Sequence, residues 1–100
     1  MTEPTAEDLE AMVRDLAATV TELDDALKEI KALGLPVHQV VAEEGERFLA
    51  KLEMAMSLNA GLFEATPSPK AKVNFLKVDD AFRTWMTTIK ELLALPRREG

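Results

Sequence analysis

The 100-residue sequence contains no cysteine and no tyrosine, and it has only one histidine and one tryptophan. The absence of cysteine excludes disulfide bonds, thiolate zinc sites and cysteine nucleophiles. Proline and glycine are also few, with five and four residues, and they are separated by long stretches that contain neither. Such stretches favour long helices over many short strands. A composition that is 47% hydrophobic is sufficient for one buried core, so residues 1–100 are expected to form a single domain.

Long hydrophobic runs are missing as well. No apolar stretch approaches the roughly 20 residues that a membrane-spanning helix requires. The first ten residues are acidic and lack the basic and then apolar layout of a secretory signal peptide. We therefore expect no membrane partner and, by default, a cytoplasmic location.

Recognisable catalytic and ligand-binding motifs are also absent. The sequence has no Gly-rich phosphate loop, no G-x-S-x-G and no H-E-x-x-H. The single histidine, His38, has no carboxylate at i+4, and the paired Glu-x-x-His motifs of di-iron bundles do not occur. We therefore predict no catalytic residue, no metal site and no cofactor, and we expect His38 in the first turn of a helix at the surface.

The formal net charge is −6, and it is unevenly distributed along the chain. Residues 1–33 carry nine acidic residues against three basic ones, whereas residues 65–100 carry four acidic residues against seven basic ones. Because non-specific binding to nucleic acid depends on neutralising phosphates, an acidic chain is a poor candidate for it. A nucleoprotein subunit that uses Lys70, Lys72 and Lys77 is therefore a disfavoured alternative.

Three segments have hydrophobic residues at alternating spacings of three and four, which is the periodicity of an amphipathic helix. The first segment covers about residues 5–33 and has an unbroken heptad seam. Thr5 is a suitable N-cap for this helix, and Gly34 followed by Pro36 is a typical helix end. The seam residues are Leu9, Val13, Leu16, Val20, Leu23, Leu27 and Ile30.

The second segment covers about residues 36–63 and repeats the same rhythm. Pro36 suits the first helical turn, because its missing N–H has no helical partner there. Gly45 lies within the hydrophobic seam, at a cost of about 1 kcal/mol in helix propensity. We therefore expect a close helix crossing at Gly45.

The third segment covers about residues 69–95. Ser68 as N-cap and Pro69 as first helical residue suit its start, and Pro96 suits its end. A short strand over residues 73–78 is the competing interpretation. It is disfavoured because a lone strand would have no pairing partner in this chain.

Short connections make sequential helices antiparallel, so the sequence predicts an all-α, up-down-up three-helix bundle with coiled-coil-like heptad packing. In this arrangement the first and third helices run parallel. The acidic start of the first helix, with Glu3, Glu7, Asp8 and Glu10, then lies at the same end as the three lysines of the third. The residues expected to be buried in the core include Leu16, Leu23, Phe48, Leu52, Phe82 and Trp85.

Four apolar residues lie outside the seams and form the predicted interface: Met54, Leu58, Val73 and Leu76. In an up-down-up bundle all four lie toward the end where the second and third helices connect. Hydrophobic residues outside the seams that build the monomer indicate that something else covers this end.

The sequence therefore favours a small, non-catalytic helical module for protein–protein interaction or assembly. Its expected partner is a second copy, in a homodimer, or another helical protein. The alternative is a small all-helical enzyme or ligand-binding bundle with a pocket between its helices. This alternative is disfavoured because no arginine or lysine occupies a seam position, where it could hold a charged ligand.

Overall fold

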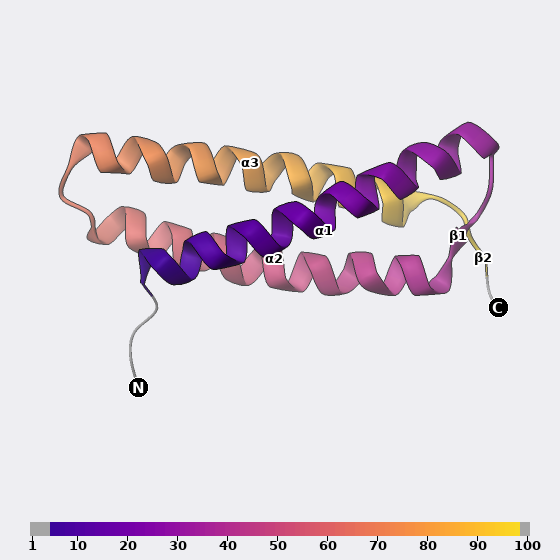
Figure 1. The fold of residues 1–100 in the computed structure, drawn as a ribbon, viewed down its shortest axis with the longest axis horizontal. Coiled ribbons are helices and arrows are strands. Elements are labelled where there is room, and N and C mark those ends of the chain that lie inside the picture. The colour runs from indigo at the N-terminus through magenta and orange to yellow at the C-terminus, as the bar shows by residue number, and fades with distance from the viewer. Residues whose placement is uncertain (1–4, 99–100) are drawn as a thin grey trace.

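The computed structural model describes residues 5–98, which form three long helices (Figure 1). Helix α1 spans Ala6–Leu33, α2 spans Gln39–Ala65 and α3 spans Pro69–Ala94. Helices α1 and α3 run in one direction and α2 runs in the other, so the predicted up-down-up bundle is confirmed. The competing strand at residues 73–78 is wrong, because this segment is helical within α3.

The ends of the helices are fixed by local hydrogen bonds that the sequence indicated. At the start of α1, Thr5 Oγ1 accepts the Asp8 N–H at 3.4 Å, and Asp8 Oδ2 accepts the Thr5 N–H at 2.7 Å. Ser68 Oγ accepts a first-turn N–H of α3 in the same way. Gly34 ends α1 with a φ of 65°, a left-handed conformation that glycine adopts without steric cost.

The start of α2 differs from the prediction. Pro36 lies before the helix, and Val37–His38 forms a short strand, β1. This strand pairs in parallel with β2, which is Arg97–Arg98. The Val37 N–H also donates to the Pro96 carbonyl oxygen at 2.8 Å, and the Val37 side chain is fully buried. The segment after α3 is therefore fastened to the connection between α1 and α2.

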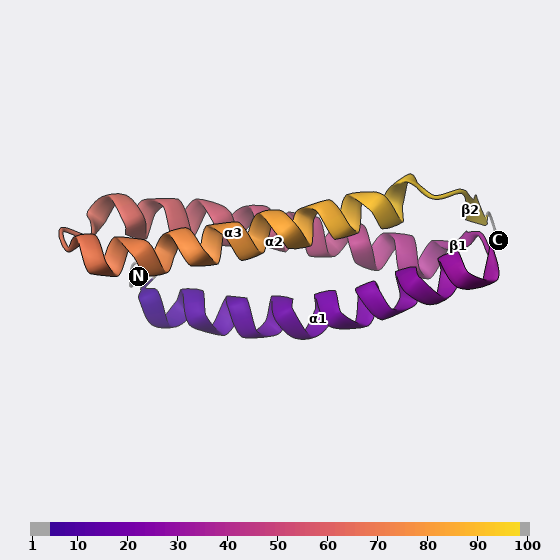
Figure 2. The same cartoon turned by 90° about the horizontal axis from the view of Figure 1, so that it is seen from above.

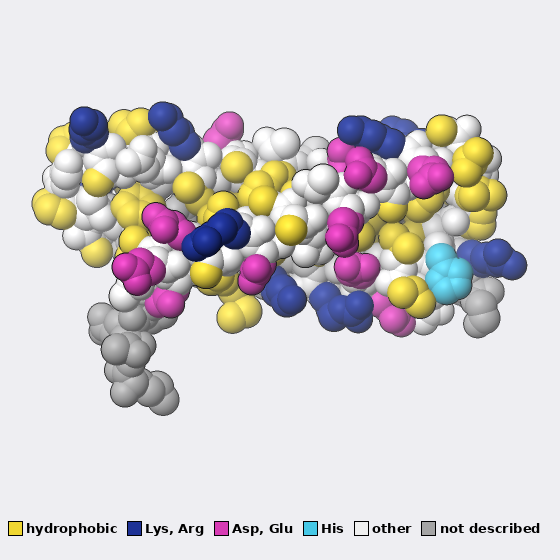
Figure 3. Space-filling view, in the orientation of Figure 1, with side chains coloured by type: hydrophobic (Ala, Val, Ile, Leu, Met, Phe, Trp, Pro, Cys, Tyr) yellow, Lys and Arg dark blue, Asp and Glu magenta, His cyan; other side chains and the backbone are white. Residues whose placement is uncertain are grey.

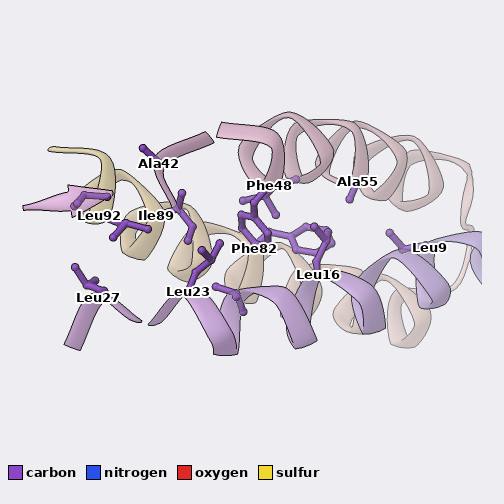
Figure 4. Close-up of a cluster of buried hydrophobic side chains, with 13 residues drawn as sticks. Leu9, Leu16, Leu23, Leu27, Ala42, Phe48, Ala55, Phe82, Ile89 and Leu92 are labelled. Atoms are coloured by element: carbon purple, nitrogen blue, oxygen red, sulfur yellow. The ribbon is translucent and has the colours of Figure 1, made fainter. Parts of the chain in front are cut away.

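The core runs along the inside of the bundle and receives side chains from all three helices (Figure 4). Five of the six residues predicted for the core are buried, and Trp85 is the exception because its side chain is only half-buried. Its ring is tilted against Phe82, with 5.6 Å between the ring centroids. The buried hydrophobic residues are Leu9, Leu16, Val20, Leu23, Leu27, Val37, Ala42, Phe48, Leu52, Ala55, Phe82, Ile89 and Leu92.

Helices α2 and α3 pack closely at Gly45, as its position in the seam indicated. A Cβ atom at Gly45 would lie 3.3 Å from Leu93 Cδ2 and 3.5 Å from Ile89 Cγ2. Gly61, in the same helix, has no atom within 4 Å of its equivalent Cβ position. Gly45 therefore lies in close contact with α3, whereas a side chain at Gly61 would meet no neighbouring atom.

We expect Gly45→Val to lower the free energy of unfolding by about 1–3 kcal/mol, because the added atoms overfill the contact with α3. The control Gly61→Ala should raise it by roughly 0.5–1 kcal/mol, since alanine has the higher helix propensity and meets no neighbour. Chemical denaturation of the two variants measures both changes. Equal effects at the two positions would contradict a close crossing at Gly45.

Helices α2 and α3 form an antiparallel hairpin, and α1 crosses one face of it diagonally (Figures 1 and 2). In Figure 1, α1 starts in front of α2 and ends beside the C-terminal end of α3. The connection between α2 and α3 extends beyond the start of α1. The diagonal crossing determines which parts of the hairpin α1 covers.

Candidate interaction surface

Large hydrophobic side chains are exposed at two places in the described chain. One group surrounds the connection between α1 and α2 and consists of Leu33, Leu35 and Val40. The other lies in the opposite half of the bundle, toward the connection between α2 and α3, and consists of Met54, Val73 and Leu76. The second group contains three of the four residues that the sequence predicted as an interface.

The fourth predicted interface residue, Leu58, is not exposed to the same extent. Met54 is 67% exposed, Leu76 is 55% exposed and Val73 is 48% exposed, whereas Leu58 is partly buried against the core. Leu58 therefore contributes to the packing of the monomer. The sequence placed it outside because the buried face of α2 is wider than the heptad seam alone.

The exposed residues of this half do not share one face. At about 100° per residue, Val73 lies half a turn around α3 from the fully buried Phe82 and points outward. Met54 lies about 200° around α2 from the fully buried Leu52 and also points outward, at the edge of a groove between α1 and α2. Because α2 and α3 pack side by side, these outward directions diverge. The predicted patch is therefore divided between the two helices.

A groove between the first halves of α1 and α3 was not predicted from the sequence. It has a volume of about 500 Å³. Its hydrophobic floor includes Leu9, which is buried, and Val13, Phe75 and Val78, which are half-buried. It exists because α1 crosses the hairpin diagonally and diverges from α3 toward its own N-terminal end (Figure 1). The complete lining is Ala6, Leu9, Glu10, Val13, Arg14, Ala71, Asn74, Phe75 and Val78.

The two edges of this α1/α3 groove carry opposite charge. Glu10 lines the α1 edge, and Glu7 lies one turn before it. Asn74 lines the α3 edge, and Lys70 and Lys77 lie at i−4 and i+3 from it, on the same side of the helix. Figure 3 shows acidic side chains over the start of α1, basic side chains along α3 and hydrophobic side chains between them.

The acidic and basic edges are not joined to each other within the described chain. The ion pairs found among residues 5–98 involve neither the two glutamates nor the two lysines of these edges. Glu3, the first acidic residue expected at this end, lies outside the described residues. The lysines and glutamates at the groove are exposed and available to a partner.

Lys72 differs from its two neighbouring lysines. Its Nζ donates to the Phe63 carbonyl oxygen at 2.7 Å and lies 4.2 Å from the centroid of the Phe63 ring. This carbonyl belongs to the last turn of α2 and also accepts the Thr66 N–H at 3.3 Å. Lys72 therefore stabilises the connection between α2 and α3 and is half-buried.

Other charged groups lie away from the groove. Hydrogen bonding to Asp24 raises the pKa of Lys28, and hydrogen bonding to Asp79 raises the pKa of Arg83. Both are exposed i,i+4 pairs on a single helix. Pairs of this kind contribute little to stability.

His38 has a structural contact. It lies before the first turn of α2, as its N-cap, and its Nδ1 accepts the Val40 N–H at 3.1 Å. The side chain is exposed, as expected. Within residues 5–98, no three His, Asp or Glu side chains come together in a group that could hold a metal ion.

Comparisons with protein-family models, with curated proteins and with solved structures find no match to this chain. In the part of the chain that the structure describes, no helix is both long enough and apolar enough to cross a membrane.

Proposed function

We propose that this chain is a non-catalytic helical assembly module that associates with a second copy of itself. The observation that carries the proposal is the uncovered hydrophobic floor of the α1/α3 groove, which includes Val13, Phe75 and Val78. Val73 is exposed on the outer side of α3 in the same half of the bundle. Full burial of a large hydrophobic side chain stabilises by roughly 1.5–3 kcal/mol. Exposed apolar surface of this kind is typical of protein contacts.

A second copy is favoured over another helical protein by the charges of this half. The same end of the bundle carries an acidic edge on α1 and a basic edge on α3, so two copies can complement each other without a further component. Twofold dimers are also the commonest closed assemblies of identical chains.

Light scattering across a range of concentrations tests the proposal. We expect the native chain to reach twice its monomer mass of 11.1 kDa. Val73→Glu should weaken the dimer and leave the helix content unchanged, because its side chain points outward. Leu33→Glu is the matched control, since Leu33 is 63% exposed at the opposite end and should tolerate the change.

Leu58 is unsuitable for this test, because Leu58→Lys would place a charge against the monomer's own core. A native chain that stays monomeric at high concentration would contradict self-association and favour another helical protein as the partner. Equal weakening by the Leu33 control would instead show that the contact surface lies elsewhere.

A small-molecule site in the α1/α3 groove is the alternative function. Its volume of about 500 Å³ is within the range of ligand sites. However, its floor is hydrophobic and its charged residues, Glu10 and Arg14, are exposed at the edge. Ligand sites usually place polar groups inside the cavity, where they orient the ligand. We therefore favour a protein partner, and native mass spectrometry for a bound small molecule distinguishes the two.

A further inference from the structure

We propose that a second copy packs its own α1/α3 groove against the α1/α3 groove of the first, and that the twofold axis of the dimer runs parallel to the helices. This inference rests on the proposed self-association and specifies its surface and symmetry. Its basis is the combination of an uncovered hydrophobic floor with two edges of opposite charge.

The floor supplies the apolar surface for the contact. Val13, Phe75 and Val78 face the space between the helices, yet each remains half-buried because α1 diverges from α3. Val73 is exposed beyond the basic edge, on the outer side of α3, at i−4 from Lys77. The facing groove of the second copy would cover these side chains and remove them from water.

The charges determine which symmetry is compatible with this contact. A twofold axis parallel to the helices places α1 of one copy on α3 of the other, at the same height along the bundle. The acidic edge with Glu7 and Glu10 then meets the basic edge with Lys70 and Lys77 of the second copy, and the same contact occurs twice. A twofold axis across the helices would instead place α1 on α1, with acidic residues opposed.

Charge reversal tests the pairing. Glu10→Lys alone and Lys77→Glu alone should each raise the dissociation constant of the dimer about tenfold, because each change replaces two attractive contacts by two repulsive ones. The double variant should return to within about threefold of the native value, since the reversed pairs attract again. Glu53→Lys and Lys90→Glu are the controls, because both sites are exposed and line no part of the groove.

Disulfide cross-linking distinguishes the two possible axes. Because the native sequence contains no cysteine, only the introduced residues can form the disulfide. A mixture of a Glu10→Cys chain and a Lys77→Cys chain should oxidise to a cross-linked dimer. Each chain alone should cross-link much less, because a disulfide requires Cα atoms within about 7 Å. Efficient cross-linking of Glu10→Cys with itself would overturn the parallel axis.

The outcomes separate this inference from the proposed function. A native dimer that responds to Val73→Glu but not to the charge reversals overturns the pairing and leaves self-association in place. Weakening by the single reversals without rescue by the double variant also overturns the pairing. A native chain that is monomeric at all concentrations overturns both.

Discussion

Replacing Phe82 by alanine should lower the free energy of unfolding by about 3–5 kcal/mol. Phe82 is fully buried in α3 and its ring contacts Trp85 across 5.6 Å. The substitution removes the largest part of a packed aromatic side chain and leaves a cavity that neighbouring side chains fill only in part. The lost transfer free energy and the cavity both destabilise the folded state.

Urea denaturation of native protein and variant measures this change. Lys90→Ala is the matched control, because Lys90 lies in the same helix, is exposed and is outside the candidate interaction surface. Its effect should stay within about 0.5 kcal/mol, as for most surface substitutions. A loss below about 1 kcal/mol for Phe82→Ala would mean that α3 presents a different face to the core.

The arrangement of the three helices was predictable because their hydrophobic spacing repeats over many turns. Residues three and four positions away from Leu16 or Leu52 lie on the same side of the helix, so a hydrophobic repeat at these spacings marks the face that packs on the core. The helix ends at Thr5, Gly34 and Ser68 were predictable for a different reason. Each is a residue type that satisfies the free backbone groups of a helix terminus locally.

The α1/α3 groove was not predictable because hydrophobic spacing fixes only how each helix is rotated about its own axis. It contains no information about the angle at which α1 crosses the hairpin. Leu9 therefore appeared as an ordinary seam position, although it lines an open groove together with Phe75. The signal present in the sequence was the charge difference between the starts of the first and third helices, and it showed only that these charges lie at the same end of the bundle.

The pairing of β1 with β2 was missed because two residues are too few to show a period. Val37 and Arg97 lie 60 positions apart, so their contact depends on the completed bundle. The misplaced Leu58 and Trp85 have another origin. Both lie at the margin of a buried face, where exposure depends on how a neighbouring helix covers it.

Asn59 is the one polar side chain buried in the described core. Its side chain is 3% exposed, and its Nδ2 donates to the Phe75 carbonyl oxygen at 3.0 Å. Its Oδ1 is buried and has no hydrogen-bond partner among the described residues. The contact joins α2 to α3, and a single buried polar contact of this kind can select the register of two helices.

Asn59→Asp should lower the free energy of unfolding at pH 7 by about 3 kcal/mol or more. The change removes the Nδ2 donor, turns a carboxylate toward the Phe75 carbonyl oxygen and buries a charge without a partner. Asn59→Leu is the matched variant. It removes one hydrogen bond but also the unpartnered Oδ1, so its effect should lie between no change and a gain of about 1 kcal/mol.

The pH dependence of the free energy of unfolding distinguishes the cost of burying a charge at position 59 from the cost of altered packing there. Burial disfavours the ionised form, so the introduced carboxyl group should have a folded-state pKa above its ordinary value of about 3.9. Between the two pKa values the folded state binds more protons than the unfolded state, and stability therefore falls as the pH rises. The free energy of unfolding of Asn59→Asp should consequently be closer to that of the native protein at pH 4 than at pH 7. The difference between Asn59→Leu and the native protein should be the same at both pH values. If urea denaturation gives an Asn59→Asp loss that is independent of pH, the carboxyl group reaches solvent and position 59 is not enclosed between α2 and α3.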